Sequence, residues 1–254
     1  MKKLLAITAL SAALFFGQTA AAEEKAAEEV KPSHVEMVLV LDESGSMSNL
    51  TNDTIGGFNS MIEKEKKLDV DAHVTTVLFN DQYKMLYNRR ELKDVRKMTD
   101  KDYTPGGMTA LLDAVGRTIH KMDMVSGIHR KDKGNKVLFV IITDGEENDS
   151  REYTYADVKK LIKDRQENAG WEFIFLGANI DAVAAAENLG IDGDRAVKYK
   201  NTGSGVRANF KAVAELSDSL AKSGRVSDEW KETVEKDEDD AADKQSAAVT
   251  LHRR

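Results

Sequence analysis

The stretch VEMVLVLDESGSM, residues 35–47, decides how this chain folds. Its first part, VEMVLVLD, is an apolar run typical of a strand buried on both faces of a parallel sheet. The run ends at Asp42, so we expect this carboxylate at the end of a central strand. A second apolar run, KVLFVIITD at 136–144, ends in the same way at Asp144. Because open parallel sheets bind ligands at the carboxyl ends of their strands, the two aspartates mark a candidate site.

Strand-like and helix-like segments alternate along much of the chain. Residues 71–80 and 83–90 carry β-branched and aromatic residues, which predicts a hairpin with its second strand at an edge of the sheet. Further strands are expected at 171–179 and 196–200. Apolar periodicity and flanking signals predict helices at 51–68, 110–125, 154–168, 180–190 and 204–225. The alternation predicts an α/β, Rossmann-like doubly wound fold of about six mostly parallel strands, one antiparallel edge strand and helices on both faces.

Length and composition indicate one globular domain. The 254 residues are 41% hydrophobic and 6% aromatic. We expect residues 34–225 to form a single domain of about 190 residues, enough for a sizeable core. Residues 23–33 are small and charged, as in a linker, and residues 226–254 form an acidic polar tail that we expect to be disordered or partly helical. Alternatively, the tail is a partner-binding segment anchored by Trp230.

The first 22 residues have the features of a bacterial secretory signal. Two lysines precede an apolar stretch at 4–16, and Ala20 and Ala22 supply small residues before a cleavage point. The apolar stretch is shorter than the roughly 20 residues that a membrane span needs. We therefore expect cleavage near Ala22 and a periplasmic or secreted protein without a membrane anchor.

Charge and cysteine content exclude several classes of protein. Without Lys2 and Lys3 the chain has 35 basic side chains against 44 acidic ones, a formal charge near −9. Such an acidic protein is a poor candidate for binding nucleic acid or anionic membranes. The absence of cysteine excludes disulfides, a cysteine-ligated zinc site, a catalytic thiol and a lipid-modified cysteine.

Five oxygen-bearing side chains form a candidate metal site. They are Asp42, Ser44 and Ser46 in DESGS, Thr109 in GGMTAL, and Asp144 in ITDGEEN. Three hydroxyls with two carboxylates suit Mg²⁺ or Mn²⁺ more than Ca²⁺, which usually gathers more carboxylate oxygens. The same residues can instead cap helices and tie loops without a metal.

These residues resemble the metal-ion-dependent adhesion site of the von Willebrand factor A (VWA) domain. The D-x-S-x-S pattern at 42–46, Thr109 shortly after a glycine pair and Asp144 in TDG fill all five positions. The order of strands and helices also fits, from about residue 35 to residue 225. The chain looks most similar to bacterial stand-alone, exported members of the family.

The resemblance implies a role for each residue. Ser44, Ser46 and Thr109 would ligate the ion, while Asp42 and Asp144 would hold it directly or through water. A Glu or Asp carboxylate of a partner protein would then complete the shell of the ion. These expectations describe an exported protein-binding module of the adhesion or scaffold type rather than an enzyme.

Two other functions remain open from the sequence. A magnesium-dependent hydrolase would use the ion as a Lewis acid, but no base stands near the site. His34 and His73 open strands at the far end of the expected sheet, and His120 lies within a helix, so structural or solvated roles are favoured. An accessory subunit of a ring ATPase complex is the second alternative, which the expected export disfavours.

Glu146 and Glu147 follow the TDG motif and lie outside its core pattern. They could add negative potential near the ion or merely solvate the loop. The sequence favours the solvated role.

Overall fold

A six-stranded sheet forms the centre of the molecule. The computed structural model describes residues 34–125 and 135–236. The strand order is β3-β2-β1-β4-β5-β6, and all neighbouring strands are parallel except β2 and β3. The strands are β1 (His34–Asp42), β2 (Ala72–Phe79), β3 (Tyr83–Glu91), β4 (Asn135–Thr143), β5 (Glu172–Gly177) and β6 (Ala196–Lys198). The expected mostly parallel sheet with one antiparallel edge strand is confirmed.

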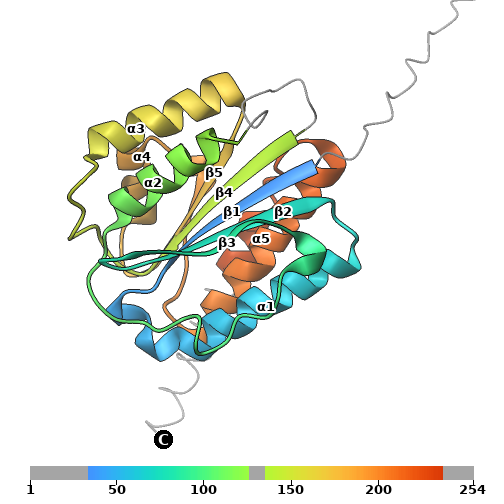
Figure 1. Cartoon of the computed structure of the whole chain (residues 1–254), viewed down its shortest axis with the longest axis horizontal. Helices are drawn as coiled ribbons and strands as arrows, with labels where there is room; N and C mark the ends of the chain where they lie inside the picture. Colours follow the sequence, from blue (N-terminus) through green and yellow to red (C-terminus); the bar gives the residue numbers. More distant parts are fainter. Residues whose placement is uncertain (1–33, 126–134, 237–254) are drawn as a thin grey trace, which may run out of the picture.

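Helices cover both faces of the sheet (Figure 1). Helices α1 and α5 pack on one face, and α2, α3 and α4 pack on the other. Strand β1 contributes side chains to the hydrophobic cores on both faces of the sheet. Met37 and Leu39 pack on the α1 and α5 side, and Val38 and Val40 pack on the side of α2, α3 and α4. The helices are α1 (Thr51–Lys67), α2 (Leu111–Asp123), α3 (Tyr155–Asp164), α4 (Ala182–Leu189) and α5 (Gly203–Ser223). In the described ranges no helix has the length and apolarity to cross a bilayer.

The strand order reverses at β1. The chain places β2 on one side of β1 and later places β4 on the other. Leu41 of β1 pairs with Ile142 of β4, so Asp42 and Thr143 reach the carboxyl edge at the same level. Such a reversal is where open α/β sheets bind their ligands.

The packed region extends past residue 225, where the sequence placed the end of the domain. Trp230 and Val234 are each 1% exposed and belong to the core on the α5 side of the sheet. Residues 230–236 are helical. Trp230 is therefore a core residue and not an exposed anchor for a partner. The rest of the expected tail, 237–254, and residues 1–33, with the expected signal and linker, lie outside the described residues.

One carboxyl group is buried between α1 and α5. Glu65 is inaccessible to solvent, and the Ser217 hydroxyl donates to its Oε2 at 2.7 Å. Its Oε1 has no hydrogen-bond partner within the described part of the chain. Burial raises the pKa of Glu65 to about 7, although the Ser217 hydrogen bond acts in the opposite direction.

The folded chain should lose stability as pH rises from about 4.5 to about 7, because it retains the Glu65 proton that the unfolded chain releases. The contribution of this group is full below pH 4.5 and lost above pH 7. In Glu65→Gln the titration is gone, so its free energy of unfolding should exceed that of the wild type by about 3 kcal/mol at high pH, which corresponds to the rise of the Glu65 pKa from 4.5 to about 7.

Urea denaturation near pH 4.5 and near pH 9 measures this difference. Glu63→Gln is the control, since Glu63 is exposed on the same helix. A Glu65→Gln effect of equal size at both pH values would contradict the raised pKa.

Candidate metal centre

Asp42 ends β1, and hydrogen bonds fix its carboxylate. Thr143 Oγ1, at the end of β4, donates to Asp42 Oδ2 at 2.6 Å. The backbone N–H of Ser44 donates to Asp42 Oδ1 at 2.7 Å. The Tyr103 hydroxyl donates to the main-chain oxygen of Asp42 at 2.6 Å. These contacts hold the aspartate at the junction of the two central strands and start the turn that follows it.

The side chains of Ser44, Ser46 and Asp144 lie in one cluster. The two serine Oγ atoms are 3.0 Å apart, and Ser46 Oγ donates to Asp144 Oδ1 at 2.5 Å. Asn201, in the loop before α5, donates through Nδ2 to Asp144 Oδ2 at 3.0 Å. Since Thr143 holds Asp42, the ends of β1 and β4 contribute to the same group of oxygen atoms.

Thr109 joins this cluster from the loop before α2. A Cβ built on Gly145 would lie 3.6 Å from Thr109 Oγ1, so the hydroxyl is beside the residue that follows Asp144. Asn148 fixes the backbone of Thr109: it accepts from Thr109 N–H at 2.8 Å and donates to Thr109 O at 3.0 Å. All five residues that the sequence singled out therefore lie at the carboxyl edge of β1 and β4.

Glu43, which the sequence did not single out, holds the loop that carries the threonine. Its carboxylate accepts from the N–H of Thr104 at 2.5 Å, and its main-chain oxygen accepts from the N–H of Gly106 at 2.9 Å. The N–H of Gly45 donates to Gly107 O at 3.2 Å. The loop thus runs alongside the turn after β1.

Glu147 is a structural residue, which corrects the solvated role that the sequence favoured. Its Oε2 accepts from the N–H of Leu112 in the first turn of α2 at 3.0 Å. Its Oε1 accepts from the N–H groups of Asp149 at 3.0 Å and Ser150 at 2.7 Å. Glu147 therefore caps α2 and closes the loop after β4, while Glu146 is exposed.

This fold and edge geometry agree with a match to a known family. The model of the vWA-TerF-like family, described as the vWA found in the TerF C terminus, matches residues 34–197. The chain belongs to this vWA family. A search of curated proteins gives no significant match.

Solved structures share the vWA fold at low sequence identity. The pilus adhesin SpaC from Lactobacillus rhamnosus GG, in its open conformation, has a TM-score of 0.58 and 15% identity, covering 76% of this chain and 31% of that one. The vWF domain of the type V pili tip protein Mfa5 from Porphyromonas gingivalis has a TM-score of 0.53 and 12% identity, covering 78% and 99%. The PilB minor pilin from Streptococcus sanguinis has a TM-score of 0.53 and 12% identity, covering 73% and 61%. The chain therefore spans less than two thirds of SpaC and of PilB, and the likeness concerns the fold.

The two aspartates of this vWA domain are buried, and no basic side chain in the described parts of the chain pairs with them. Asp42 is 1% exposed and Asp144 is 2% exposed. In residues 34–125 and 135–236, no Lys, Arg or His forms an ion pair with either carboxylate. Burial raises the pKa of Asp42, and the charge of Asp144 adds to the effect, against hydrogen bonds from Thr143 and Ser44. The arrangement favours a cation beside the two carboxylates.

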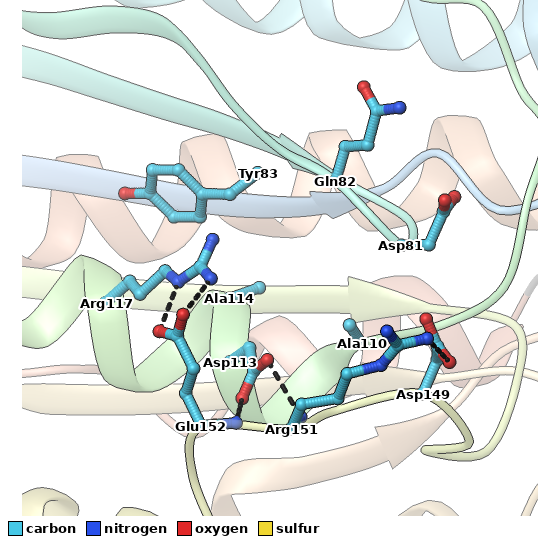
Figure 2. Close-up of a pocket in the computed structure, with 10 residues that line it drawn as sticks. All are labelled: Asp81, Gln82, Tyr83, Ala110, Asp113, Ala114, Arg117, Asp149, Arg151 and Glu152. Carbon is cyan, nitrogen blue, oxygen red and sulfur yellow. Dashed lines mark hydrogen bonds and ion pairs between the residues drawn. The ribbon is translucent and has the colours of Figure 1, made fainter.

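A pocket adjoins the site on the side of α2, and charged side chains that pair with one another line it (Figure 2). Arg117 Nε donates to Glu152 Oε2 at 2.8 Å, and Arg151 Nη2 donates to Asp149 Oδ1 at 3.1 Å. Asp113 accepts from the N–H groups of Arg151 and Glu152. Burial acts to raise the pKa of Asp113, but the backbone donors outweigh it and the pKa lies below its ordinary value. These contacts hold the loop after β4 against α2.

Gly107→Ala should destabilise the domain, because Gly107 has a φ of +76° and its added Cβ would lie 2.0 Å from Asp81 Oδ1. A left-handed backbone and the displaced Asp81 together should lower the free energy of unfolding by about 1–3 kcal/mol. Urea denaturation measures the loss. Gly106→Ala is the matched control, since a Cβ there meets nothing within 4 Å. Equal losses in both variants would show that the special conformation of Gly107 is not the cause.

Proposed function

We propose that this vWA domain binds one Mg²⁺ or Mn²⁺ ion and uses it to bind a partner protein. The observation that carries the proposal is the pair of carboxylates of Asp42 and Asp144, buried at the strand ends without a basic partner among the described residues. Burying uncompensated charge is strongly unfavourable in proteins. A divalent cation would supply the positive charge.

The oxygen donors fit a small, hard cation. Magnesium binds oxygen at about 2.0–2.1 Å in octahedral geometry, so neighbouring ligand atoms lie about 3 Å apart. The Oγ atoms of Ser44 and Ser46 have a spacing of 3.0 Å. In this proposal Ser44, Ser46 and Thr109 supply hydroxyl ligands, and Asp42 and Asp144 act directly or through water. Because the hydroxyls are neutral, the ion keeps its attraction for a further carboxylate.

The rim of the site supports a protein partner that presents an Asp or Glu. Gly45 and Ser46 are exposed, so the serine can be approached from solvent. Met108, next to Thr109, is 50% exposed and offers a flexible apolar contact beside the polar site. The similar folds of a pilus adhesin and a pili tip protein support an adhesion or scaffold role.

We further propose that the domain is not an enzyme and works in the periplasm or outside the cell. The signal-like first 22 residues support export. His34 and His73 lie at the amino ends of their strands, and His120 lies on α2, exposed to solvent. Along the described chain no histidine base therefore stands at the carboxyl edge, which favours binding over hydrolysis. Export also disfavours a role in a cytoplasmic ring ATPase complex.

Calorimetric titration of the full chain with Mg²⁺ and Mn²⁺ should show one saturable site. Asp42→Asn and Ser46→Ala each remove an oxygen atom of the proposed metal site, so the affinity for the ion should fall by about tenfold or more. Asp149→Asn is the control, because it removes an acid from the adjoining loop and leaves the cluster intact. Wild-type affinity in both cluster variants would refute the metal site.

A partner captured from periplasmic or extracellular fractions should remain bound in Mg²⁺ and be released by chelator. Asp42→Asn should fail to retain it, whereas Asp149→Asn should retain it, because only the first change weakens the ion that the partner carboxylate contacts. Quantitative binding of the isolated partner checks this expectation. Equal retention of the partner with and without divalent ions would show that partner binding does not depend on the metal ion.

A further inference from the structure

Two histidines and a glutamate meet at the amino ends of β1 and β2, the edge of the sheet opposite the Asp42 cluster. Glu36 of β1 is the register partner of His73 of β2. His34 lies two residues before Glu36, so both side chains point to the same face of β1. Parallel pairing thus gathers three side chains with metal-binding chemistry into one group.

The three candidate ligand atoms form a compact triangle. His34 Nε2 is 2.8 Å from His73 Nδ1, and Glu36 Oε1 is 3.4 Å and 3.3 Å from these two nitrogens. A tetrahedral zinc site with bonds of about 2.0–2.1 Å has neighbouring ligand atoms about 3.3–3.4 Å apart. Two edges already match this spacing. The third edge, between His34 Nε2 and His73 Nδ1, would lengthen by about half an ångström when bonds to an ion replace the contact between these nitrogens.

Neighbouring groups orient these ligands. Asp71 Oδ1 is 3.0 Å from His34 Nδ1, so it can accept that ring proton and leave Nε2 free to bind an ion. Arg89 Nε donates to Glu36 Oε2 at 3.0 Å, which leaves Oε1 toward the histidines. Glu36 is 1% exposed, whereas the side chains of His34 and His73 are 18% and 26% exposed. The histidines line a surface pocket, which gives an ion access from solvent.

Arg89 also competes for the same carboxylate. Its Nη2 contacts Glu36 Oε1 and lies 3.4 Å from His73 Nδ1. An ion at the triangle would require Nη2 to withdraw while the Nε contact to Oε2 stays. The Arg89 side chain is 31% exposed and so can move toward solvent. Removing this guanidinium should therefore strengthen metal binding.

We propose that His34, Glu36 and His73 form a second metal site, for Zn²⁺ or a similar transition ion, with water completing the shell. Two imidazole nitrogens and one carboxylate oxygen select such an ion over Mg²⁺ or Ca²⁺, which prefer oxygen ligands. The site shares no residue with the Asp42 cluster and is independent of the proposed magnesium function. Zinc bound there would tie the amino end of β1 to β2.

Zinc titration of the full, untagged chain against a fluorescent zinc indicator tests the site. A background variant with His120, His129 and His252 replaced by alanine removes the other histidines and should still bind one zinc ion. In this background, His34→Ala and His73→Ala should each weaken binding about tenfold or more. Saturable zinc binding that survives both changes, or no saturable binding in the wild type, would overturn the proposal.

Two further variants keep the test decisive if loss of a histidine disturbs the fold. Arg89→Met leaves all three ligands in place and should bind zinc several-fold more tightly; unchanged or weaker binding counts against the site. Asp42→Asn should bind zinc as the wild type does, which separates this site from the magnesium site. Cobalt(II) gives a direct readout, since tetrahedral coordination should produce strong visible absorption in the wild type and not in His73→Ala.

Discussion

The hydrogen bond from Thr143 to Asp42 is the contact on which the arrangement of the metal centre depends. It joins the carboxyl ends of β1 and β4, the two strands at the reversal of strand order. Asp42 also accepts the N–H of Ser44, which directs the turn that brings Ser46 to Asp144. A buried carboxylate needs such donors, because burial without them is strongly unfavourable. The sheet therefore positions the first aspartate, and the loops add the remaining oxygen atoms around it.

Acidic side chains perform two different tasks at this edge of the molecule. Glu43, Asp113 and Glu147 accept backbone N–H groups of adjoining loops, so their charges fix the course of the chain. Asp42 also accepts a backbone N–H, from Ser44, but Asp42 and Asp144 lie by the serine hydroxyls, and no basic side chain of the two described ranges forms an ion pair with either. The proposed ligands are distinguished by their place beside Ser44 and Ser46 at the ends of β1 and β4, and the structural acids by the loops whose backbone they hold. Such a division cannot be read from the spacing of acidic residues, since the donors come from other loops.

Contacts between distant segments also explain the residues that sequence reasoning missed. His34 and His73 stand at the starts of different strands, and only the register of β1 with β2 sets Glu36 beside them. Trp230 stands in an acidic stretch whose composition is typical of a tail, yet it packs into the core on the α5 side. Glu147 is one of two adjacent glutamates, and its neighbour is exposed. Hydrophobic periodicity describes local segments and does not report which of them lie side by side.

The sequence by itself determined the type and order of the main elements and the strand ends that carry Asp42 and Asp144, because apolar runs and helical periods are local properties of the chain. The D-x-S-x-S pattern and the threonine after the glycine pair, with their resemblance to the VWA site, also singled out Ser44, Ser46 and Thr109. Only the tertiary structure decided which nearby acids are structural, which histidines meet and how far the packed domain extends. These features depend on burial and on hydrogen bonds between segments far apart in the chain, which exist only once the sheet has assembled.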